Sequence, residues 1–227
     1  MATQQNKEQE QNAIENLNSH LTKAGETVAN NKQIIYWVIG AILVIAAGIA
    51  AYIWLYKVPN DKNSQAAYDQ VEMKAQGNDS IAAAEYAKVA DKYSSTPAGN
   101  IAAFQAAVAN YRLGKYAETV KYLDKFSTKD ELLSAQADVL LGDANVNLKK
   151  YDDAIAAFNK ALRTASGNPQ IAPMVLWKMA NVYDAQKNYA EALKCYEQIK
   201  EGYPEFSFGN GISVDAYIAR EQARLGK

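Results

Sequence analysis

The sequence predicts an all-α protein, in which one N-terminal transmembrane helix precedes a solenoid of helix pairs that ends in a capping helix. Three observations predict this architecture. Residues 34–56 contain no charged side chain, whereas polar residues interrupt every other hydrophobic stretch. A helix–turn–helix segment that opens its second helix with tyrosine recurs at Tyr116, Tyr151 and Tyr189. No segment shows the sustained two-residue alternation of a half-buried strand.

The uncharged segment, residues 34–56, has the length and composition of a membrane anchor. At about 1.5 Å per helical residue it spans roughly 30 Å of hydrocarbon with some tilt. Its apolar character continues around the whole helix, so a water-soluble domain would have to cover it on every side. Interfacial aromatic residues occur at both ends: Tyr36, Trp37, Tyr52, Trp54 and Tyr56. We therefore expect a single-pass membrane protein.

A cleaved signal peptide and a lipoprotein anchor are both disfavoured. The polar lead of 33 residues is too long for an n-region, and the apolar run exceeds an h-region of about 7–15 residues. No cysteine follows the run closely. One feature of the anchor suits packing against another membrane helix, because small residues let two backbones approach. These residues are Gly40, Ala47, Gly48 and Ala51.

Two polar segments flank the anchor. Residues 1–33 form a lead in which apolar residues are spaced by three and four: Ile14, Leu17, Leu21, Ala24 and Val28. This pattern covers two heptads, fewer than the three or four that indicate a coiled coil. The lead is interpreted either as a frayed polar helix or as a helix that binds a partner or the membrane surface. Residues 57–63 are expected to link the anchor to the helical domain.

Charge and the rare reactive residues argue against several function classes. The chain has 24 basic and 25 acidic residues, a formal net charge of −1, and no basic patch that suggests nucleic acid. The single cysteine, Cys195, and the single histidine, His20, are too far apart for a zinc site or a catalytic pair. We therefore expect no metal, no cofactor and no enzymatic activity. Cys195 is interpreted as a small structural hydrophobe.

The recurring segment resembles the tetratricopeptide repeat, a helix–turn–helix unit of about 34 residues. Each copy ends one helix, turns through a polar pair and opens a second helix that carries an acidic residue in its first turn, where the helix dipole favours it. The family's small, aromatic and small positions are matched by Ala154, Phe158 and Ala161, its first-helix glycine by Gly142 and its closing proline by Pro204.

This resemblance implies repeats over residues 64–210, in about four helix pairs. The pairs are expected at 64–76 with 80–93, 98–113 with 116–126, 131–148 with 151–165, and 171–186 with 189–202. Ser64 and Asp130 are expected N-caps. Residues 211–227 are expected to form the capping helix that a solenoid needs, with one apolar face made of Ile212, Ala216, Ala219 and Ala223.

In the tetratricopeptide family the first helix of each pair lines a concave groove that binds partners. Transferred by register, the groove residues are Phe104, Val108, Tyr111, Val139, Asp143, Asn147, Trp177, Asn181 and Asp184. Their aromatic, aliphatic and acceptor side chains suit a peptide or an unfolded segment. Phe104 and Trp177 are interpreted either as contact residues or as packing residues. Asp143 and Asp184 form a carboxylate pair only by proximity and do not indicate catalysis.

One anchor followed by three to four degenerate repeats is similar to the YfgM-like family of bacterial inner-membrane proteins. That resemblance implies a scaffold or ancillary chaperone with a cytoplasmic N-terminus and periplasmic repeats. The partners that it implies are Sec translocon subunits, a membrane-anchored periplasmic prolyl-isomerase-like chaperone and exported polypeptides. Lysines flank the anchor on both sides, so charge alone leaves the orientation open. The alternative is a general assembly scaffold for an envelope or secretion complex, whose repeats could face the cytoplasm.

Overall fold

The computed structural model describes residues 14–22, 25, 32–165, 167–209 and 211–226. All regular secondary structure in these ranges is helical, which confirms the all-α prediction. The chain divides into two compact units, Met1–Pro59 and Asn60–Lys227. In the lead, the apolar positions 14, 17 and 21 lie on a helix over residues 14–22 and are exposed, whereas positions 24 and 28 lie outside the described residues.

The first unit contains the predicted membrane anchor. Helix α2 (Lys32–Tyr52) continues directly into a π-helical segment, η1 (Ile53–Lys57). Large apolar side chains are exposed along both, and the exposed fraction of Trp37 reaches 80%. Within the described part of the chain, this is the one helix long and apolar enough to cross a membrane. Exposure of this kind is what a helix surrounded by lipid requires.

The predicted packing residues of the anchor are open to their surroundings. Ala47, Gly48 and Ala51 are exposed and Gly40 is half-exposed. A Cβ atom added at Gly40 or Gly48 would meet no heavy atom within 4 Å. The role of these residues in helix packing stays a prediction.

Residues 57–63, which we expected to be a linker, are helical. Helix α3 (Val58–Ala75) begins directly after η1. Pro59 has no N–H group, and its ring would crowd the carbonyl of Leu55 in a regular α-helix. The preceding π turn, in which the Val58 N–H donates to the Ile53 carbonyl, widens the helix at this point. The helix therefore continues through the proline instead of ending there.

Of the two predicted N-caps, Asp130 is confirmed and Ser64 is wrong. The Asp130 carboxylate accepts a hydrogen bond from the Leu133 N–H at 2.8 Å. Ser64 lies inside α3, because that helix starts before it, and its side chain is buried. The Ser64 hydroxyl donates instead to the Asp61 carbonyl at 2.8 Å, the back-bonding typical of serine within a helix.

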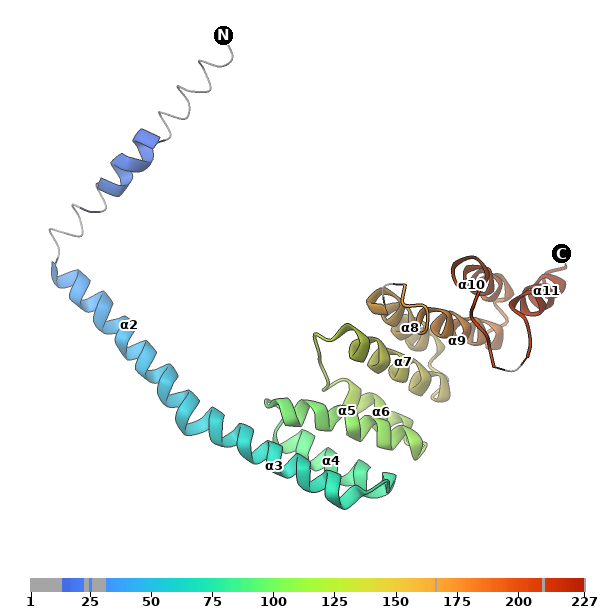
Figure 1. Cartoon of the computed structure of the whole chain (residues 1–227), viewed down its shortest axis with the longest axis horizontal. Helices are drawn as coiled ribbons and strands as arrows, with labels where there is room; N and C mark the ends of the chain where they lie inside the picture. Colours follow the sequence, from blue (N-terminus) through green and yellow to red (C-terminus); the bar gives the residue numbers. More distant parts are fainter. Residues whose placement is uncertain (1–13, 23–24, 26–31, 166, 210, 227) are drawn as a thin grey trace, which may run out of the picture. The chain divides into compact units, whose positions relative to one another are not determined.

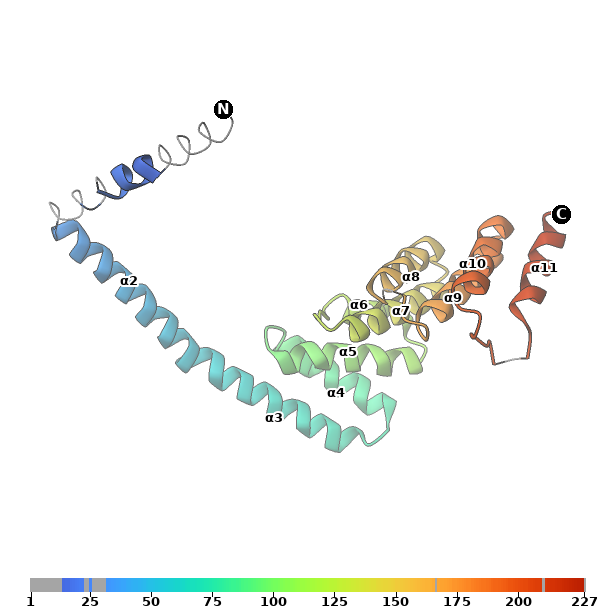
Figure 2. The ribbon, with the colours of Figure 1, turned by 45° about the horizontal axis from the view of Figure 1, so that its top comes forward.

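The second unit is a stack of helix pairs, visible from two directions in Figures 1 and 2. After α3, the helices are α4 (Asp79–Lys92), α5 (Pro97–Arg112), α6 (Tyr116–Leu123), α7 (Glu131–Asn147), α8 (Tyr151–Ala165), α9 (Ala172–Ala185), α10 (Tyr189–Gly202) and α11 (Val214–Arg224). Each helix from α4 to α11 packs on the next, and Tyr68 of α3 packs on Tyr86 of α4. The predicted solenoid is confirmed. Two helices differ most from the predicted bounds. Helix α3 starts at Val58 instead of residue 64, and α6 ends at Leu123 instead of residue 126.

The turn inside each pair places a residue with positive φ two positions before the second helix begins, and in the first turn the preceding Gln76 also has a positive φ of 35°. The residues two positions before the second helix are Gly77 (φ 84°), Gly114 (φ 70°), Lys149 (φ 59°) and Lys187 (φ 59°). In the last three turns the next N–H bonds to the carbonyl five residues earlier, which is the Schellman closure of a helix C-terminus. The same turn therefore recurs even where lysine replaces glycine. At those positions the lysine backbone adopts a left-handed conformation that is strained for residues with a Cβ atom but not for glycine.

Small residues bring the two helices of the third pair together. A Cβ atom at Gly142 of α7 would lie 2.3 Å from Cε1 of Phe158 on α8. Phe158 is fully buried, and Ala154 and Ala161 on either side of it are also fully buried. The small–aromatic–small pattern therefore has the packing role that the family resemblance implies.

The capping helix α11 is present, but it packs through a different face from the one predicted. Ile212 lies before the helix, and the three predicted alanines are exposed. The packed face carries Tyr217, whose ring stacks on Tyr196 of α10 at a centroid distance of 5.0 Å. Val214 and Ile218 also pack against the core. Burial of these larger side chains removes more apolar area from water than burial of alanine.

Candidate functional site

The predicted partner-binding residues lie on α5, α7 and α9, the first helices of successive pairs. We call these nine residues the first-helix surface. Three pairs, α5 with α6, α7 with α8, and α9 with α10, pack in sequence, so equivalent positions recur on the first helices. The side chains differ in exposure, and this difference decides which of them are available to a partner.

On α5, all three predicted residues are half-buried. The Phe104 ring packs on Phe126 at a centroid distance of 5.0 Å, so the packing interpretation describes it better than the contact interpretation. The Tyr111 ring meets Tyr116 edge to face at 5.5 Å. Burial, and then the negative charge of Asp143, raise the pKa of Tyr111. Val108 keeps part of its side chain accessible.

On α7, one of the three residues is unavailable. Val139 is buried in the hydrophobic core. Asp143 is half-buried, and both of its carboxylate oxygens accept hydrogen bonds from Lys178 Nζ, at 2.8 and 2.9 Å. Burial raises the pKa of Asp143, while the hydrogen bond and charge of Lys178 oppose that rise. Asn147 is exposed, and its amide donates to the Asp143 carbonyl at 2.8 Å.

On α9, the chain itself occupies much of the surface. Trp177 packs on Phe208 at 5.8 Å, and its buried Nε1 has no hydrogen-bond partner among the described residues. Asp184 pairs with two arginines of α11, Arg220 at 3.2 Å and Arg224. Asn181 is exposed. The cap therefore covers one end of the first-helix surface and leaves Asn181 accessible.

A buried carboxylate on α11 binds the same two arginines that pair with Asp184 of α9. Glu221 is fully buried, and it accepts hydrogen bonds from Arg220 at 2.7 Å and from Arg224 at 3.2 Å. A buried carboxylate is tolerated only when cations and donors compensate it. The same two arginines therefore satisfy Glu221 and neutralise Asp184.

Pairs of opposite charge connect the first helix pair to the second, the third pair to the fourth, and the fourth pair to α11, and sequence analysis missed them. They join residues about one repeat apart: Asp79 with Arg112, Asp91 with Lys125, Asp143 with Lys178, and Asp184 with Arg220. The signal was available, because an acidic residue followed by a basic one after a full repeat places both at the same interface of a solenoid. This spacing would have identified Lys178 as the partner of Asp143.

The resulting surface is chemically neutral. Both of its carboxylates are paired, its exposed side chains are the amides Asn147 and Asn181, and its accessible apolar part comes from half-buried residues such as Val108. Among the described residues, no group of three or more histidine, cysteine or acidic side chains could hold a metal ion. Such a surface can bind an extended polypeptide through amide hydrogen bonds and apolar contacts, without a requirement for charge.

Comparisons with known proteins agree with this architecture. A tetratricopeptide repeat model matches residues 133–205, and a tetratricopeptide repeat-like domain model matches residues 28–133. The ancillary SecYEG translocon subunit of Neisseria gonorrhoeae is 28% identical over 182 residues, which cover 78% of this chain and 85% of that protein.

Two crystal structures of MamA share the fold at 22% sequence identity. They have TM-scores of 0.56 and 0.55, cover 74% and 68% of this chain, and are each covered to 83% of their own length. The two family models together span residues 28–205. This chain is a tetratricopeptide-repeat protein, and it resembles the ancillary subunit of the SecYEG translocon.

Proposed function

We propose that this protein is a single-pass inner-membrane scaffold and ancillary chaperone of the Sec protein-export translocon. The observation that carries the proposal is its similarity to an ancillary SecYEG translocon subunit over 85% of that protein's length. The role is non-catalytic: the repeats hold a partner, and the anchor confines them beside the translocon. Confinement raises the effective concentration of both binding partners, so weak contacts suffice.

The two units have separate tasks in this proposal. The anchor docks on Sec translocon subunits through its open small residues, among them Gly40 and Gly48. The first-helix surface binds a membrane-anchored periplasmic prolyl-isomerase-like chaperone or a newly exported chain. Its neutrality supports this second task, because exported polypeptides share a backbone and apolar side chains but no common charge. Asn147 and Asn181 would hydrogen-bond the backbone of the bound segment.

Affinity purification of the tagged full chain from membranes tests the proposal. The wild-type protein should recover Sec subunits together with the chaperone. Replacing Gly40 and Gly48 with isoleucine should reduce Sec recovery, because the added side chains keep a neighbouring helix away. A double variant, Asn147→Lys with Asn181→Lys, should lose the chaperone and keep Sec. Recovery of neither partner by the wild-type protein would overturn the proposal.

A matched control separates the first-helix surface from a general effect of added charge. Ala156 on α8 and Gln198 on α10 are exposed residues of second helices. The double variant Ala156→Lys with Gln198→Lys adds the same two charges on the other helices of the same pairs. It should retain both partners. Loss of the chaperone in this control as well would show that the effect of added charge is not specific to the first-helix surface.

The orientation in the membrane separates the proposal from a general scaffold with cytoplasmic repeats. Cys195 gives no background in a labelling experiment, because it is buried and burial raises the pKa of its thiol to about 12. Cysteines introduced at the exposed positions Ser19 and Ala223 then report the two sides. A membrane-impermeant maleimide added to spheroplasts should label A223C and leave S19C unlabelled until the membrane is opened. The opposite pattern would support the cytoplasmic alternative.

A further inference from the structure

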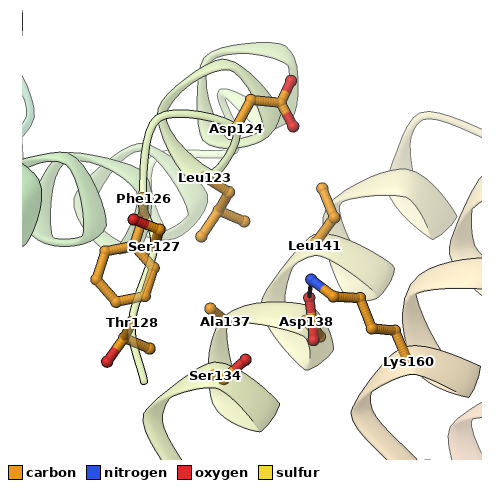
Figure 3. Close-up of a pocket in the computed structure, with 10 residues that line it drawn as sticks. All are labelled: Leu123, Asp124, Phe126, Ser127, Thr128, Ser134, Ala137, Asp138, Leu141 and Lys160. Carbon is orange, nitrogen blue, oxygen red and sulfur yellow. Dashed lines mark hydrogen bonds and ion pairs between the residues drawn. The ribbon is translucent and has the colours of Figure 1, made fainter. Parts of the chain in front are cut away.

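A cavity of about 450 Å³ lies between the end of α6, the segment that follows it, and helices α7 and α8 (Figure 3). It shares no residue with the first-helix surface. Its origin is the short second helix of the second pair: α6 has 8 residues, whereas α4, α8 and α10 have 14 or 15. The chain leaves the helix after Leu123, and irregular backbone lines the space that a longer helix would fill.

The wall of this cavity contains a buried carboxylate with one unsatisfied oxygen. The exposed fraction of Asp138 is 4%. Its Oδ1 accepts a hydrogen bond from Lys160 Nζ at 2.9 Å, and Figure 3 shows these two side chains meeting at the cavity. Asp138 Oδ2 is buried and has no hydrogen-bond partner among the described residues. A buried acceptor of this kind is costly to leave unpaired, so it points to a ligand that donates a hydrogen bond.

The remaining lining identifies the donor as a cation with an apolar stem. Two carboxylates, Asp124 and Asp138, line the cavity against one ammonium group, Lys160, so the lining is acidic on balance. The Lys160 side chain is 61% exposed, and water therefore weakens its compensation of the carboxylate. The Phe126 ring offers a face to a cation. Leu123, Ala137 and Leu141 offer apolar contact to a methylene chain.

We propose that this cavity binds an arginine side chain presented by an extended polypeptide. The guanidinium group donates to Asp138 Oδ2 and lies against Phe126, while its methylene stem contacts the apolar residues. Arginine suits the site better than lysine, because its planar group can bond a carboxylate and stack on an aromatic ring at once. This site is separate from the first-helix surface and does not depend on association with the Sec translocon.

Two synthetic peptides that differ only in the head group of one side chain test the proposal. The peptide amide Gly-Leu-Arg-Leu-Gly is compared with its citrulline analogue, in which an uncharged urea group replaces the guanidinium group. Binding to the full chain in lipid nanodiscs is followed by ligand-observed NMR, with empty nanodiscs as the reference. We expect the arginine peptide to bind at least about tenfold more tightly, because a hydrogen bond between charged groups is stronger than a neutral one. Equal binding, or no binding up to about 5 mM peptide, would overturn the proposal.

Variants connect the preference for arginine to Asp138. Asp138→Asn keeps the shape of the side chain and removes its charge, so it should abolish the preference for the arginine peptide. Asp124→Asn removes the exposed carboxylate at the same cavity and should change the arginine affinity less than about threefold. A preference that survives in Asp138→Asn would contradict the assignment.

A second variant decides the matter if Asp138→Asn does not fold. Ser134→Leu places a larger side chain in the cavity from the half-exposed start of α7. It should prevent binding of both peptides, while circular dichroism shows an unchanged helix content. Retention of the arginine preference in the folded Ser134→Leu protein would overturn the proposal.

Discussion

At the level of single residues, close approach and burial decide which substitutions the repeats tolerate. Gly142 faces the buried ring of Phe158, and no flexible side-chain end lies between them that could move aside. Gly202, at the end of α10, has no heavy atom within 4 Å of a built Cβ. Both glycines lie in helices, but only at Gly142 does close packing exclude a larger side chain.

The substitution Gly142→Ala should lower the free energy of unfolding by about 1–3 kcal/mol, because the added methyl group overpacks the interface between α7 and α8. Gly202→Ala adds the same methyl group into open space and should leave stability unchanged or raise it by up to about 1 kcal/mol. Urea unfolding of the full chain in detergent, followed by circular dichroism, measures both. Equal effects of the two substitutions would contradict the packing role of Gly142.

Cys195 makes stability depend on pH in the alkaline range. Burial raises the pKa of its thiol from 9.0 to about 12, so between these values the unfolded chain releases a proton that the folded chain keeps. Stability therefore falls as the pH rises above 9, by at most about 1.4 kcal/mol per unit. Burial also raises the pKa values of Tyr86 and Tyr196 from 10.0 to about 12. Their contributions to the loss of stability therefore begin about one pH unit higher than that of Cys195.

Wild-type protein should lose about 1 kcal/mol more unfolding free energy between pH 8 and pH 10 than the variant Cys195→Ala. The comparison uses urea unfolding at both pH values under reducing conditions. The variant is less stable overall because it leaves a small cavity, but the difference between the two pH values isolates the thiol. An identical loss in both proteins would show that the thiol is not protected.

At the level of elements, the sequence predicted which helices exist and in what order they occur. It predicted less well which face of a helix is buried and where a helix ends. The recurring tyrosines mark the second helices at Tyr116, Tyr151 and Tyr189, and all three helices begin there. Helix α11 shows the limit. Its four spaced small and aliphatic residues indicated a buried face, but the gap left by α10 requires larger side chains, and Tyr217 fills it. The shape of the surface on which α11 packs therefore decides which of its faces is buried, and the spacing of residues within α11 does not reveal that shape.

The two faces of α11 give a direct comparison. Tyr217→Ala should destabilise the cap by about 3 kcal/mol or more, because it removes a buried ring that stacks on α10. Ala219→Gln, on the face that the sequence pattern favoured, should change stability by less than about 0.5 kcal/mol, because Ala219 is exposed. Thermal unfolding of the full chain measures both. A larger effect from Ala219→Gln would restore the face predicted from sequence.

For the whole molecule, the helices that carry the candidate binding residues could be predicted from the sequence, but the exposure of those residues could not. Family register placed the nine residues on three first helices, which the structure confirms as helices. Val139 is buried, Trp177 packs on Phe208, and Asp184 is paired with α11, because neighbouring repeats and the cap cover them. Those contacts depend on residues a full repeat away. An interpretation of each helix on its own therefore cannot predict these contacts. The spacing of opposite charges along the chain indicates some of them.

The most direct measurement is site-specific photocrosslinking in native membranes, since it reports what touches each surface. A photoreactive amino acid at Asn147 or Asn181 should crosslink to the isomerase-like chaperone or to an exported chain. The same amino acid at Ala156 or Gln198, on the second helices, should not. Crosslinks from the second helices alone, or none from Asn147 and Asn181 while export is active, would contradict a partner-binding role for the first-helix surface.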